Sequence, residues 1–277
     1  MKTVLVVANE TLGGRPLLER IKEKAADEEI RVVVCVPRTN PRQGNIIYDD
    51  AVFDAAQVRI DLARKLLREQ GISEATGEVG DPDPYTATLD AIAEFHPDEV
   101  VISTHPAASS GWLRRDLIER IEESTTVPVE HVVVDLDEEG LPFDVTLAVA
   151  NRTAASDTFL AALKKRGSGD SHVFIFVIPQ EDGHGVAARQ ARARLTQAID
   201  RARAADLICA GMIGDPDPYT AVMNAVQFFR VSDIVISTLP ATRSGWMRAD
   251  LIERVRKATN VPVEHVEASD TAETTAA

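Results

Sequence analysis

Cysteines, aromatic residues and long apolar runs are scarce in this chain of 277 residues. Its two cysteines, Cys35 and Cys209, each lie inside an apolar stretch, which favours a buried free thiol over a disulfide or a metal ligand. The apolar runs are far shorter than the roughly 20 residues that cross a bilayer. The N-terminus runs directly into a strand-like segment and lacks the pattern of a signal peptide. We therefore expect a cytoplasmic protein without disulfides.

Basic residues are also too few to balance the acidic ones. The chain has 30 Lys and Arg against 44 Asp and Glu, which gives a formal net charge of −14. Nucleic acids and anionic membrane surfaces bind to basic stripes, so we expect neither as a direct partner. Hydrophobic residues (44%) and charged residues (27%) are close to the averages of soluble globular proteins, and the length favours two domains.

One segment of the sequence occurs twice. The eight residues Gly-Asp-Pro-Asp-Pro-Tyr-Thr-Ala begin at Gly80 and again at Gly214, 134 positions later. Three shorter matches keep the same offset: Val-Ile-Ser-Thr from Val101 and Val235, Ser-Gly-Trp from Ser110 and Ser244, and Val-Pro-Val-Glu-His from Val127 and Val261. The matches predict a duplicated domain of roughly 140 residues.

The beginnings of the two copies follow a different offset. Val-Ala-Asn-Glu-Thr from Val7 pairs with Val-Ala-Asn-Arg-Thr from Val149, 142 positions later, so the second copy lacks eight residues farther on. We expect the loss at 37–50, because the corresponding stretch 179–185 is shorter. We assign 1–137 to domain 1, 138–142 to an acidic connector, 143–268 to domain 2 and 269–277 to a disordered polar tail.

Each copy alternates β-branched runs with amphipathic helical patterns, which is typical of a parallel sheet covered on both faces. In copy one we predict strands at 3–8, 30–36, 74–79, 99–104 and 129–134, and a helix near 112–123. The predicted fold class is α/β, with two tandem doubly wound five-stranded parallel sheets and helices on both faces. In such sheets, ligands bind at the carboxyl ends of the strands.

Both copies resemble the universal stress protein family. The resemblance lies in the order strand, Asn-x-Thr, helix, Gly-Asp-Pro, helix, a strand ending in Ile-Ser-Thr, and Val-Pro-Val. It implies an adenine-nucleotide α-hydrolase-like fold. In nucleotide-binding members of that family, an Asp at the end of the first strand meets adenosine, and the loop Gly-x-x-Gly-x9-Gly-Ser/Thr after the fourth strand holds the ATP phosphates.

Both copies depart from this glycine loop. In place of its three glycines and its hydroxyl residue, the copies have Ser103, Pro106, Asp116 and Leu117, and Ser237, Pro240, Asp250 and Leu251. Asn9 and Asn151 replace the family's Asp. Proline has no N–H to donate and an aspartate repels phosphate, so the usual ATP mode is weakened. The cofactor stays undetermined, with ATP and AMP as candidates.

The candidate ligand site combines residues from the ends of strands one, two and four with the Ser-Gly-Trp-x-Arg loop. An arginine beside a helix start can hold a phosphate without a glycine loop. The predicted residues are Asn9, Thr11, Val36, Ser103, Thr104, Ser110, Gly111 and Arg114 in copy one, and Asn151, Thr153, Ile178, Ser237, Thr238, Ser244, Gly245 and Arg248 in copy two. The open alternative is that Ser109 or Ser110 caps a helix, Trp112 packs in the core and Arg114 pairs with a carboxylate.

Two further repeated features have structural interpretations. We expect Asp83 to cap a helix that begins with Pro84, and Asp217 to do the same in copy two. His131 and His265, on the last strands, suit packing or an interface better than base catalysis. No catalytic triad or zinc spacing recurs in both copies, so we predict no enzymatic activity and no metal site. Slow ATP hydrolysis is the least supported alternative.

The favoured hypothesis is a non-enzymatic, universal stress-type protein that binds a nucleotide or another small anion between strands one and four of each domain. The alternative is a scaffold that has lost nucleotide binding and recruits a protein partner. Because the last strands lie at sheet edges, we expect the copies to pair as an internal pseudo-dimer, with further homodimerisation open. Since both copies depart from the glycine loop in the same way, we expect their sites to behave alike.

Overall fold

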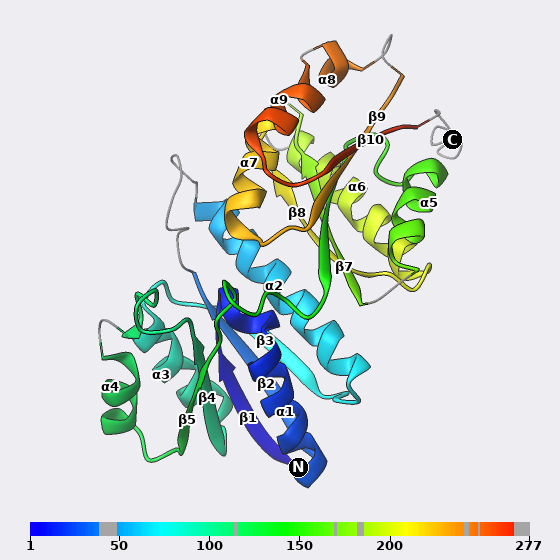
Figure 1. Cartoon of the computed structure of the whole chain (residues 1–277). Helices are drawn as coiled ribbons and strands as arrows, with labels where there is room; N and C mark the ends of the chain where they lie inside the picture. Colours follow the sequence, from blue (N-terminus) through cyan, green and yellow to red (C-terminus); the bar gives the residue numbers. More distant parts are fainter. Residues whose placement is uncertain are drawn as a thin grey trace. The chain divides into compact units, whose positions relative to one another are not determined.

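The computed structural model describes residues 1–38, 49–113, 116–168, 171–181, 186–240, 244–248 and 250–268. They form two compact units with the same order of strands in their sheets (Figure 1). Apart from the first residues of α2, the division falls between Pro142 and Phe143. No helix of the described ranges is long and apolar enough to cross a membrane.

Unit 1 alternates strands and helices along the chain. Its strands are β1 (Lys2–Val7), β2 (Ile30–Pro37), β3 (Ala75–Gly80), β4 (Glu99–Thr104) and β5 (Val129–Val133). Its helices are the 3-10 helix η1 (Glu10–Gly13), α1 (Arg15–Asp27), α2 (Asp49–Glu69), α3 (Pro84–Phe95) and α4 (Leu117–Ser124).

Unit 2 repeats this order. Its strands are β6 (Asp144–Val149), β7 (His172–Pro179), β8 (Ile208–Gly214), β9 (Asp233–Thr238) and β10 (Val263–Glu267). Its helices are α5 (Asp157–Arg166), α6 (Val186–Arg203), α7 (Pro218–Phe228), α8 (Gly245–Arg248) and α9 (Leu251–Ala258).

Both sheets have five parallel strands, in the orders β3-β2-β1-β4-β5 and β8-β7-β6-β9-β10. The predicted α/β fold class is therefore confirmed. The strand order reverses direction between β1 and β4, and between β6 and β9. At such a switch point the loops on either side leave in opposite directions and open a crevice at the carboxyl ends of the strands. The predicted residues that follow β1 and β6, and those that end β4 and β9, lie at these two switch points.

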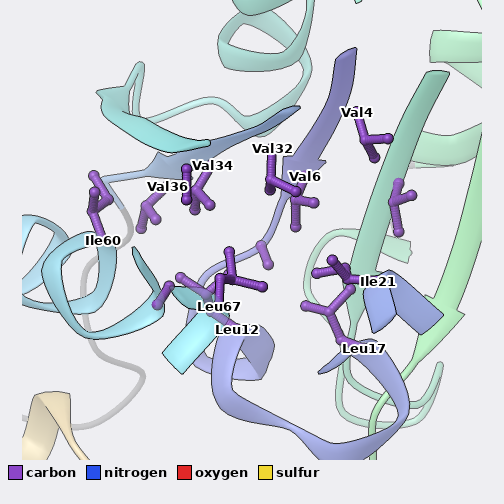
Figure 2. Packing of buried hydrophobic residues seen from close by; sticks show 14 of the residues in the cluster. Val4, Val6, Leu12, Leu17, Ile21, Val32, Val34, Val36, Ile60 and Leu67 are labelled. Atoms are coloured by element: carbon purple, nitrogen blue, oxygen red, sulfur yellow. The ribbon is translucent and has the colours of Figure 1, made fainter. Parts of the chain in front are cut away.

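The strands are buried on both faces because helices cover both sides of each sheet. Successive residues of β1 belong to different cores: Val4 and Val6 pack on one face, Leu5 and Val7 on the other. Figure 2 shows the first of these cores, in which β1 and β2 pack against α1 and α2 through Leu17, Ile21, Ile60 and Leu67. The opposite face packs against α3 and α4. This explains the uninterrupted apolar runs, because a strand covered on both sides has no solvent face.

The Gly-Asp-Pro-Asp-Pro-Tyr segment is a turn and a helix cap in both units. The Asp83 carboxylate accepts a hydrogen bond from the Thr86 backbone N–H at 3.2 Å, and Pro84 is the first residue of α3. The Asp217 carboxylate caps α7 in the same way, at 2.9 Å from the N–H of Thr220. The structural interpretation of the paired aspartates is confirmed for these two residues.

The helix predicted near 112–123 begins later than expected. In unit 1, α4 starts at Leu117, after Asp116 adopts a left-handed conformation with φ of 49°. In unit 2, Asp250 has φ of 52° and separates the short α8 from α9. A left-handed residue cannot continue a right-handed helix, so the apolar periodicity extended the prediction too far towards the N-terminus.

The eight missing residues of the second copy are not all lost in one place. The side chain of Ile60 in α2 lies over Gly77, and that of Leu195 in α6 lies over Gly211. Ile60 and Leu195 are 135 positions apart, while the two glycines are 134 apart. One residue is therefore missing from the turn that precedes the third strand, and the stretch 37–50 accounts for the other seven.

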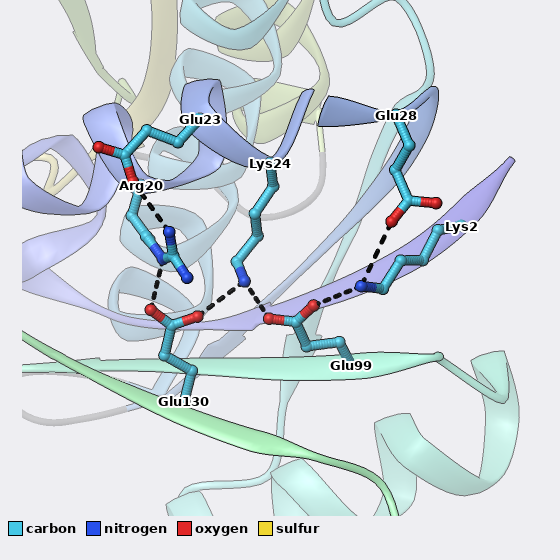
Figure 3. Close-up of polar contacts among 7 residues, drawn as sticks. All are labelled: Lys2, Arg20, Glu23, Lys24, Glu28, Glu99 and Glu130. Carbon is cyan, nitrogen blue, oxygen red and sulfur yellow. Dashed lines mark hydrogen bonds and ion pairs between the residues drawn. The ribbon is translucent and has the colours of Figure 1, made fainter. Parts of the chain in front are cut away.

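A chain of ion pairs joins α1 to β4 and β5 at the amino ends of the strands (Figure 3). Lys24 of α1 pairs with Glu99, the first residue of β4, and with Glu130 of β5, the latter at 2.7 Å. Lys2 pairs with Glu99 at 2.8 Å, and Arg20 pairs with Glu130 at 2.5 Å. Each carboxylate therefore has two cationic partners.

Unit 2 contains the same arrangement in smaller form. Arg166, near the end of α5, pairs with Asp233 of β9 at 2.9 Å and with Glu264 of β10. These residues occupy the positions of Lys24, Glu99 and Glu130 in the repeat. In both units, one cation fastens the first long helix to the fourth and fifth strands, at the end of the sheet opposite the crevice.

Candidate functional site

A threonine joins the two central strands of each sheet at the switch point. The hydroxyl of Thr11, just after β1, donates to the carbonyl of Ser103 in β4 at 3.2 Å. The hydroxyl of Thr153 donates to the carbonyl of Ser237 at 3.1 Å in unit 2. Both threonines are buried. Each hydrogen bond therefore ties the residues that follow the first strand to the end of the fourth strand at the switch point.

The serines at these strand ends carry buried hydroxyls without a partner among the described residues. The side chains of Ser103 and Ser237 are each 1% exposed, and neither Oγ makes a hydrogen bond there. Oδ1 of Asn9 is in the same state. A buried polar atom without a partner costs about 1–3 kcal/mol and so needs an explanation, such as a ligand or water that completes it. The same unsatisfied hydroxyl occurs in both units and makes the crevice the candidate site.

The neighbouring threonines are instead satisfied within the protein. The Thr104 hydroxyl donates to the carbonyl of His105 at 2.8 Å, so it accepts from Nε2 of His131 at 2.9 Å. Thr238 and His265 are 2.8 Å apart in the same arrangement. Burial lowers the pKa of His131 and of His265, which favours the neutral ring with its proton on Nε2. The repeated histidine therefore orients the last residue of strand four, as a packing residue would.

The Ser-Gly-Trp loop is a tight turn. The backbone N–H of Ser110 donates to the Pro106 carbonyl at 2.8 Å, and its side-chain Oγ accepts from the N–H of Leu113 at 3.2 Å. In unit 2, the N–H of Ser244 donates to the Pro240 carbonyl at 2.9 Å. These two N–H groups therefore form hydrogen bonds within the loop.

The glycines and arginines of this loop give little evidence on whether it can hold an anion. Gly111 and Gly245 are exposed. Arg114 lies outside the described residues, and of Arg248 only its place at the end of α8 is described. Because α8 has four residues, the expected help of a helix start in holding a phosphate is small. An anion at this loop would therefore need cations from other segments.

Val36 and Ile178 are core residues. Each is fully buried, on the face of its sheet that packs against the first two helices of the unit. Their side chains therefore pack in the core, and the predicted contact of these two residues with a ligand would involve their backbone groups. Both strands end one residue later, at Pro37 and Pro179.

Unit 2 has a cavity of about 300 Å³ at its switch point. This volume is at the lower end of the range for small-molecule sites. The lining includes the predicted polar residues that follow β6 and end β9, the start of the Ser-Gly-Trp loop, and the unsatisfied Ser237. It consists of Asn151, Arg152, Thr153, Glu181, Ser237, Thr238, Leu239, Ser244, Gly245 and Trp246.

Two arginines and a glutamate set the charge of this cavity. Nε of Arg152 lies 3.1 Å from Oε1 of Glu181, and Nη1 of Arg194 lies 3.4 Å from the same oxygen. Nη1 of Arg194 also donates to Oδ1 of Asn151 at 2.6 Å. The hydrogen bond from Arg152 is the main cause that lowers the pKa of Glu181, so this carboxyl is ionised at neutral pH. The three groups together carry one net positive charge.

The sequence analysis missed these three residues. Arg152 had a visible signal, because it stands beside the repeated Asn151 where copy one has Glu10. Glu181 and Arg194 come from the end of β7 and from α6, and only the fold brings them to the switch point.

The equivalent place in unit 1 is arranged differently. Nε2 of His105 lies 3.1 Å from Oε2 of Glu10, which joins the residues that follow β4 and β1. Nδ2 of Asn9 donates to the carbonyl of Pro37 at 2.9 Å. Arg59 of α2 occupies the position of Arg194, since the next residue in each helix lies over the equivalent glycine. Burial lowers the pKa of Arg59, and the charge of Glu10 opposes that shift.

Asp116 and Asp250 stand where the resemblance places the third glycine of the phosphate loop. Their positive φ angles, 49° and 52°, belong to the left-handed region that glycine enters without strain. The loop backbone therefore has a glycine-like conformation at a position that carries a charged side chain.

No family model matches the sequence, and a comparison with curated proteins finds no match. Solved structures do match. A universal stress protein from Archaeoglobus fulgidus DSM 4304 matches over 97% of this chain and 97% of its own, with 15% identity and a TM-score of 0.35. Another from Archaeoglobus fulgidus matches over 48% of this chain and 100% of its own, with 15% identity and a TM-score of 0.37. A universal stress protein in complex with cAMP matches over 47% and 96%, with 14% identity and a TM-score of 0.34.

These three structures are universal stress proteins, the family that the motifs of both copies resemble. At these identities the likeness concerns the fold alone. The ligand chemistry of this chain therefore rests on its own residues.

Proposed function

We propose that this chain is a non-enzymatic ligand-binding protein of the universal stress type, which holds a nucleotide or another small phosphate-bearing molecule at a switch point of its parallel sheets. The observation that carries the proposal is the buried hydroxyl of Ser237. It lines the cavity of unit 2, is 1% exposed and has no partner among the described residues. A ligand that accepts its hydrogen bond would remove the cost of burying it.

The charges around the cavity favour an anion. Arg152 and Arg194 share one carboxylate, and guanidinium groups bind phosphate oxygens through paired N–H donors. Leu239 and Trp246 supply apolar surface beside these polar groups. A small cavity with a few convergent polar groups and an apolar wall is the usual form of a small-molecule site.

Titration calorimetry with ATP, AMP and cAMP tests this proposal, together with mass spectrometry of any molecule that co-purifies with the chain. We expect binding of at least one of these nucleotides, and no change in the bound nucleotide over hours because the proposed role is not catalytic. Steady release of phosphate or of a nucleotide product would contradict the non-enzymatic role. Absence of binding for all three, with nothing co-purified, would contradict the nucleotide proposal.

A serine variant shows whether the cavity is the binding site. Ser237→Ala removes a hydroxyl that makes no bond in the described structure, so folding stability should stay the same or rise, while nucleotide affinity should fall about fivefold to tenfold. Thr76→Val in β3 is the matched control, because Oγ1 of Thr76 is also buried without a partner but lies outside the cavity lining. Equal nucleotide affinities of the two variants would place the ligand elsewhere.

A second candidate function is a scaffold that binds a protein partner. It is favoured by Pro106 and Pro240, which stand at the second glycine of the family's phosphate loop and have no N–H to donate. The calorimetric experiment separates the two candidates. A scaffold would bind none of the nucleotides, neither as wild type nor as Ser237→Ala.

A further inference from the structure

The two copies differ at the position directly after the repeated asparagine. Copy one has Glu10 and copy two has Arg152. Both residues follow the first strand of their sheet, at the mouth of the crevice described above. The exchange changes the local charge by two units, at the place where a bound phosphate would add negative charge.

In unit 1 the acidic residue lies across the crevice. Glu10 follows β1 and pairs with His105, which follows β4, at 3.1 Å. These two strands border the switch point, so the pair bridges the entrance from one side to the other. A phosphate-bearing ligand would have to break this pair and then lie beside the Glu10 carboxylate.

In unit 2 the basic residue lies to one side. Arg152 pairs with Glu181, which follows β7, and β7 borders β6 on the side away from β9. Leu239 replaces His105, so a side chain that could form the equivalent bridge is absent from that position. Arg152 and Leu239 both line the cavity of about 300 Å³.

Among the described residues, the cations nearby do not cancel this difference. Arg59 and Arg194 occupy equivalent positions in the two units, and each supplies one positive charge. Arg38 of unit 1 donates to the carbonyl of Gly80 at 3.3 Å, towards β3 and away from the switch point. In unit 2, the charge of Glu181 offsets that of either Arg152 or Arg194, so these three groups leave one net positive charge. In unit 1, Glu10 offsets Arg59.

We propose that the two sites are not equivalent: unit 2 binds the phosphate-bearing ligand, and the Glu10–His105 bridge excludes it from unit 1. Each chain then binds one ligand. This inference rests on the proposed function and names the copy that performs it. It also replaces the expectation that both sites behave alike. That expectation considered only the glycine loop, which both copies have lost, whereas the crevice mouths carry opposite charges, Glu10 in unit 1 and Arg152 in unit 2.

Reciprocal exchange of the mouth residues tests the inference in the full-length chain. Calorimetric titration with AMP, and with inorganic phosphate as the minimal anion, should give one site per wild-type chain. Arg152→Glu should weaken that site about tenfold or more. Conversely, the double variant Glu10→Arg/His105→Leu should add a second site and raise the stoichiometry to two.

Two further variants serve as controls. Arg203→Glu, on an exposed residue at the far end of α6, makes the same change in net charge as Arg152→Glu and should leave affinity and stoichiometry unchanged. His105→Leu alone breaks the bridge but keeps the Glu10 carboxylate, so it should not create a full second site. Circular dichroism of each variant verifies that it is folded.

The possible outcomes are distinct. Two equal sites in the wild-type chain would overturn the inference while the proposed function stands, and so would a single site that is unaffected by Arg152→Glu. Failure of Glu10→Arg/His105→Leu to gain a site would refute the role of the bridge. If no variant binds AMP, phosphate or any other nucleotide, the proposed function fails and this inference fails with it.

Discussion

Lys24 is the residue whose replacement should destabilise unit 1 most clearly without touching the candidate site. It is 11% exposed and lies between the carboxylates of Glu99 and Glu130 (Figure 3). Lys24→Met keeps most of the apolar stem and removes the ammonium group. The change therefore tests how much the ion-pair cluster contributes to holding α1 against β4 and β5.

The expected loss follows from the partners that remain. A hydrogen bond to a charged group contributes about 1.5–3 kcal/mol, and Lys24 makes two. Glu99 keeps Lys2 at 2.8 Å, and Glu130 keeps Arg20 at 2.5 Å, so neither carboxylate is left without a cation. We therefore expect a loss of about 2–3 kcal/mol in the free energy of unfolding, below the roughly 3–5 kcal/mol for a buried charge left alone.

The loss should depend on pH. For Glu99 and Glu130, burial is the largest single influence and raises the pKa, but the hydrogen bonds from their cationic partners outweigh it, and both pKa values are lowered. A carboxyl with a lowered folded pKa stabilises the protein above its unfolded pKa of about 4.3, and this stability is lost as the pH falls through the folded pKa. Without Lys24, the pKa values of Glu99 and Glu130 should be lowered less, because each carboxylate loses one cationic partner. The difference between wild type and variant should therefore be largest near neutral pH and shrink in acid.

Urea unfolding at neutral pH and in acid measures this difference. The chain has two tryptophans, Trp112 in unit 1 and Trp246 in unit 2, so a Trp246→Phe background lets fluorescence report on unit 1 alone. Lys22→Met is the matched control, because Lys22 is exposed on the same helix and its replacement makes the same charge change. Lys24→Met within about 0.5 kcal/mol of this control at neutral pH would refute the reasoning, as would a difference that does not shrink in acid.

Three further predictions concern the backbone and the core. Asp250→Gly should stabilise unit 2 by up to about 1 kcal/mol in urea unfolding, because glycine adopts the φ of 52° without strain; an unchanged or lower midpoint would contradict this. Gly214→Ala should cost about 1–3 kcal/mol in the same assay, since the added methyl group would lie 2.6 Å from Cβ of Ala221; a neutral effect would show that β8 and α7 can separate cheaply. Burial raises the pKa of Cys35 to about 12, so its thiol should resist iodoacetamide at mildly alkaline pH until the protein unfolds, and rapid modification of the native chain, detected by mass spectrometry, would show that the thiol is accessible.

Much of the fold could be predicted from the sequence. The five strands predicted in copy one agree with β1 to β5 within one residue at each end. They were readable because strands buried on both faces appear as uninterrupted β-branched runs, and the helices between them place those strands in parallel. The start of α4 was not readable in the same way. Its apolar pattern continues towards Trp112, but the left-handed backbone at Asp116 interrupts the helix.

The candidate site could be predicted only in part. The asparagine, threonine and serine residues at the strand ends were found because they recur in both copies and match the order of motifs in a known family. The core packing of the Val36 and Ile178 side chains was not readable, because the sequence pattern at a strand end does not say which face of the sheet a side chain occupies. The bonds of Thr11 and Thr153 to the facing strand, and the unsatisfied hydroxyls of Ser103 and Ser237, required three-dimensional contacts.

The sequence by itself determined that this protein is a duplicated α/β domain whose copies share polar residues at the ends of strands one and four, because repeats, periodicity and motif order are properties of the linear chain. The tertiary structure decided which charges meet at those ends. Arg152, Glu181 and Arg194 come from separate segments and converge only when β6, β7 and α6 pack together, while Glu10 closes on His105 across the other crevice. Electrostatic interactions depend on distance in space, so the different pairing of charges in the two copies became visible only in the folded chain.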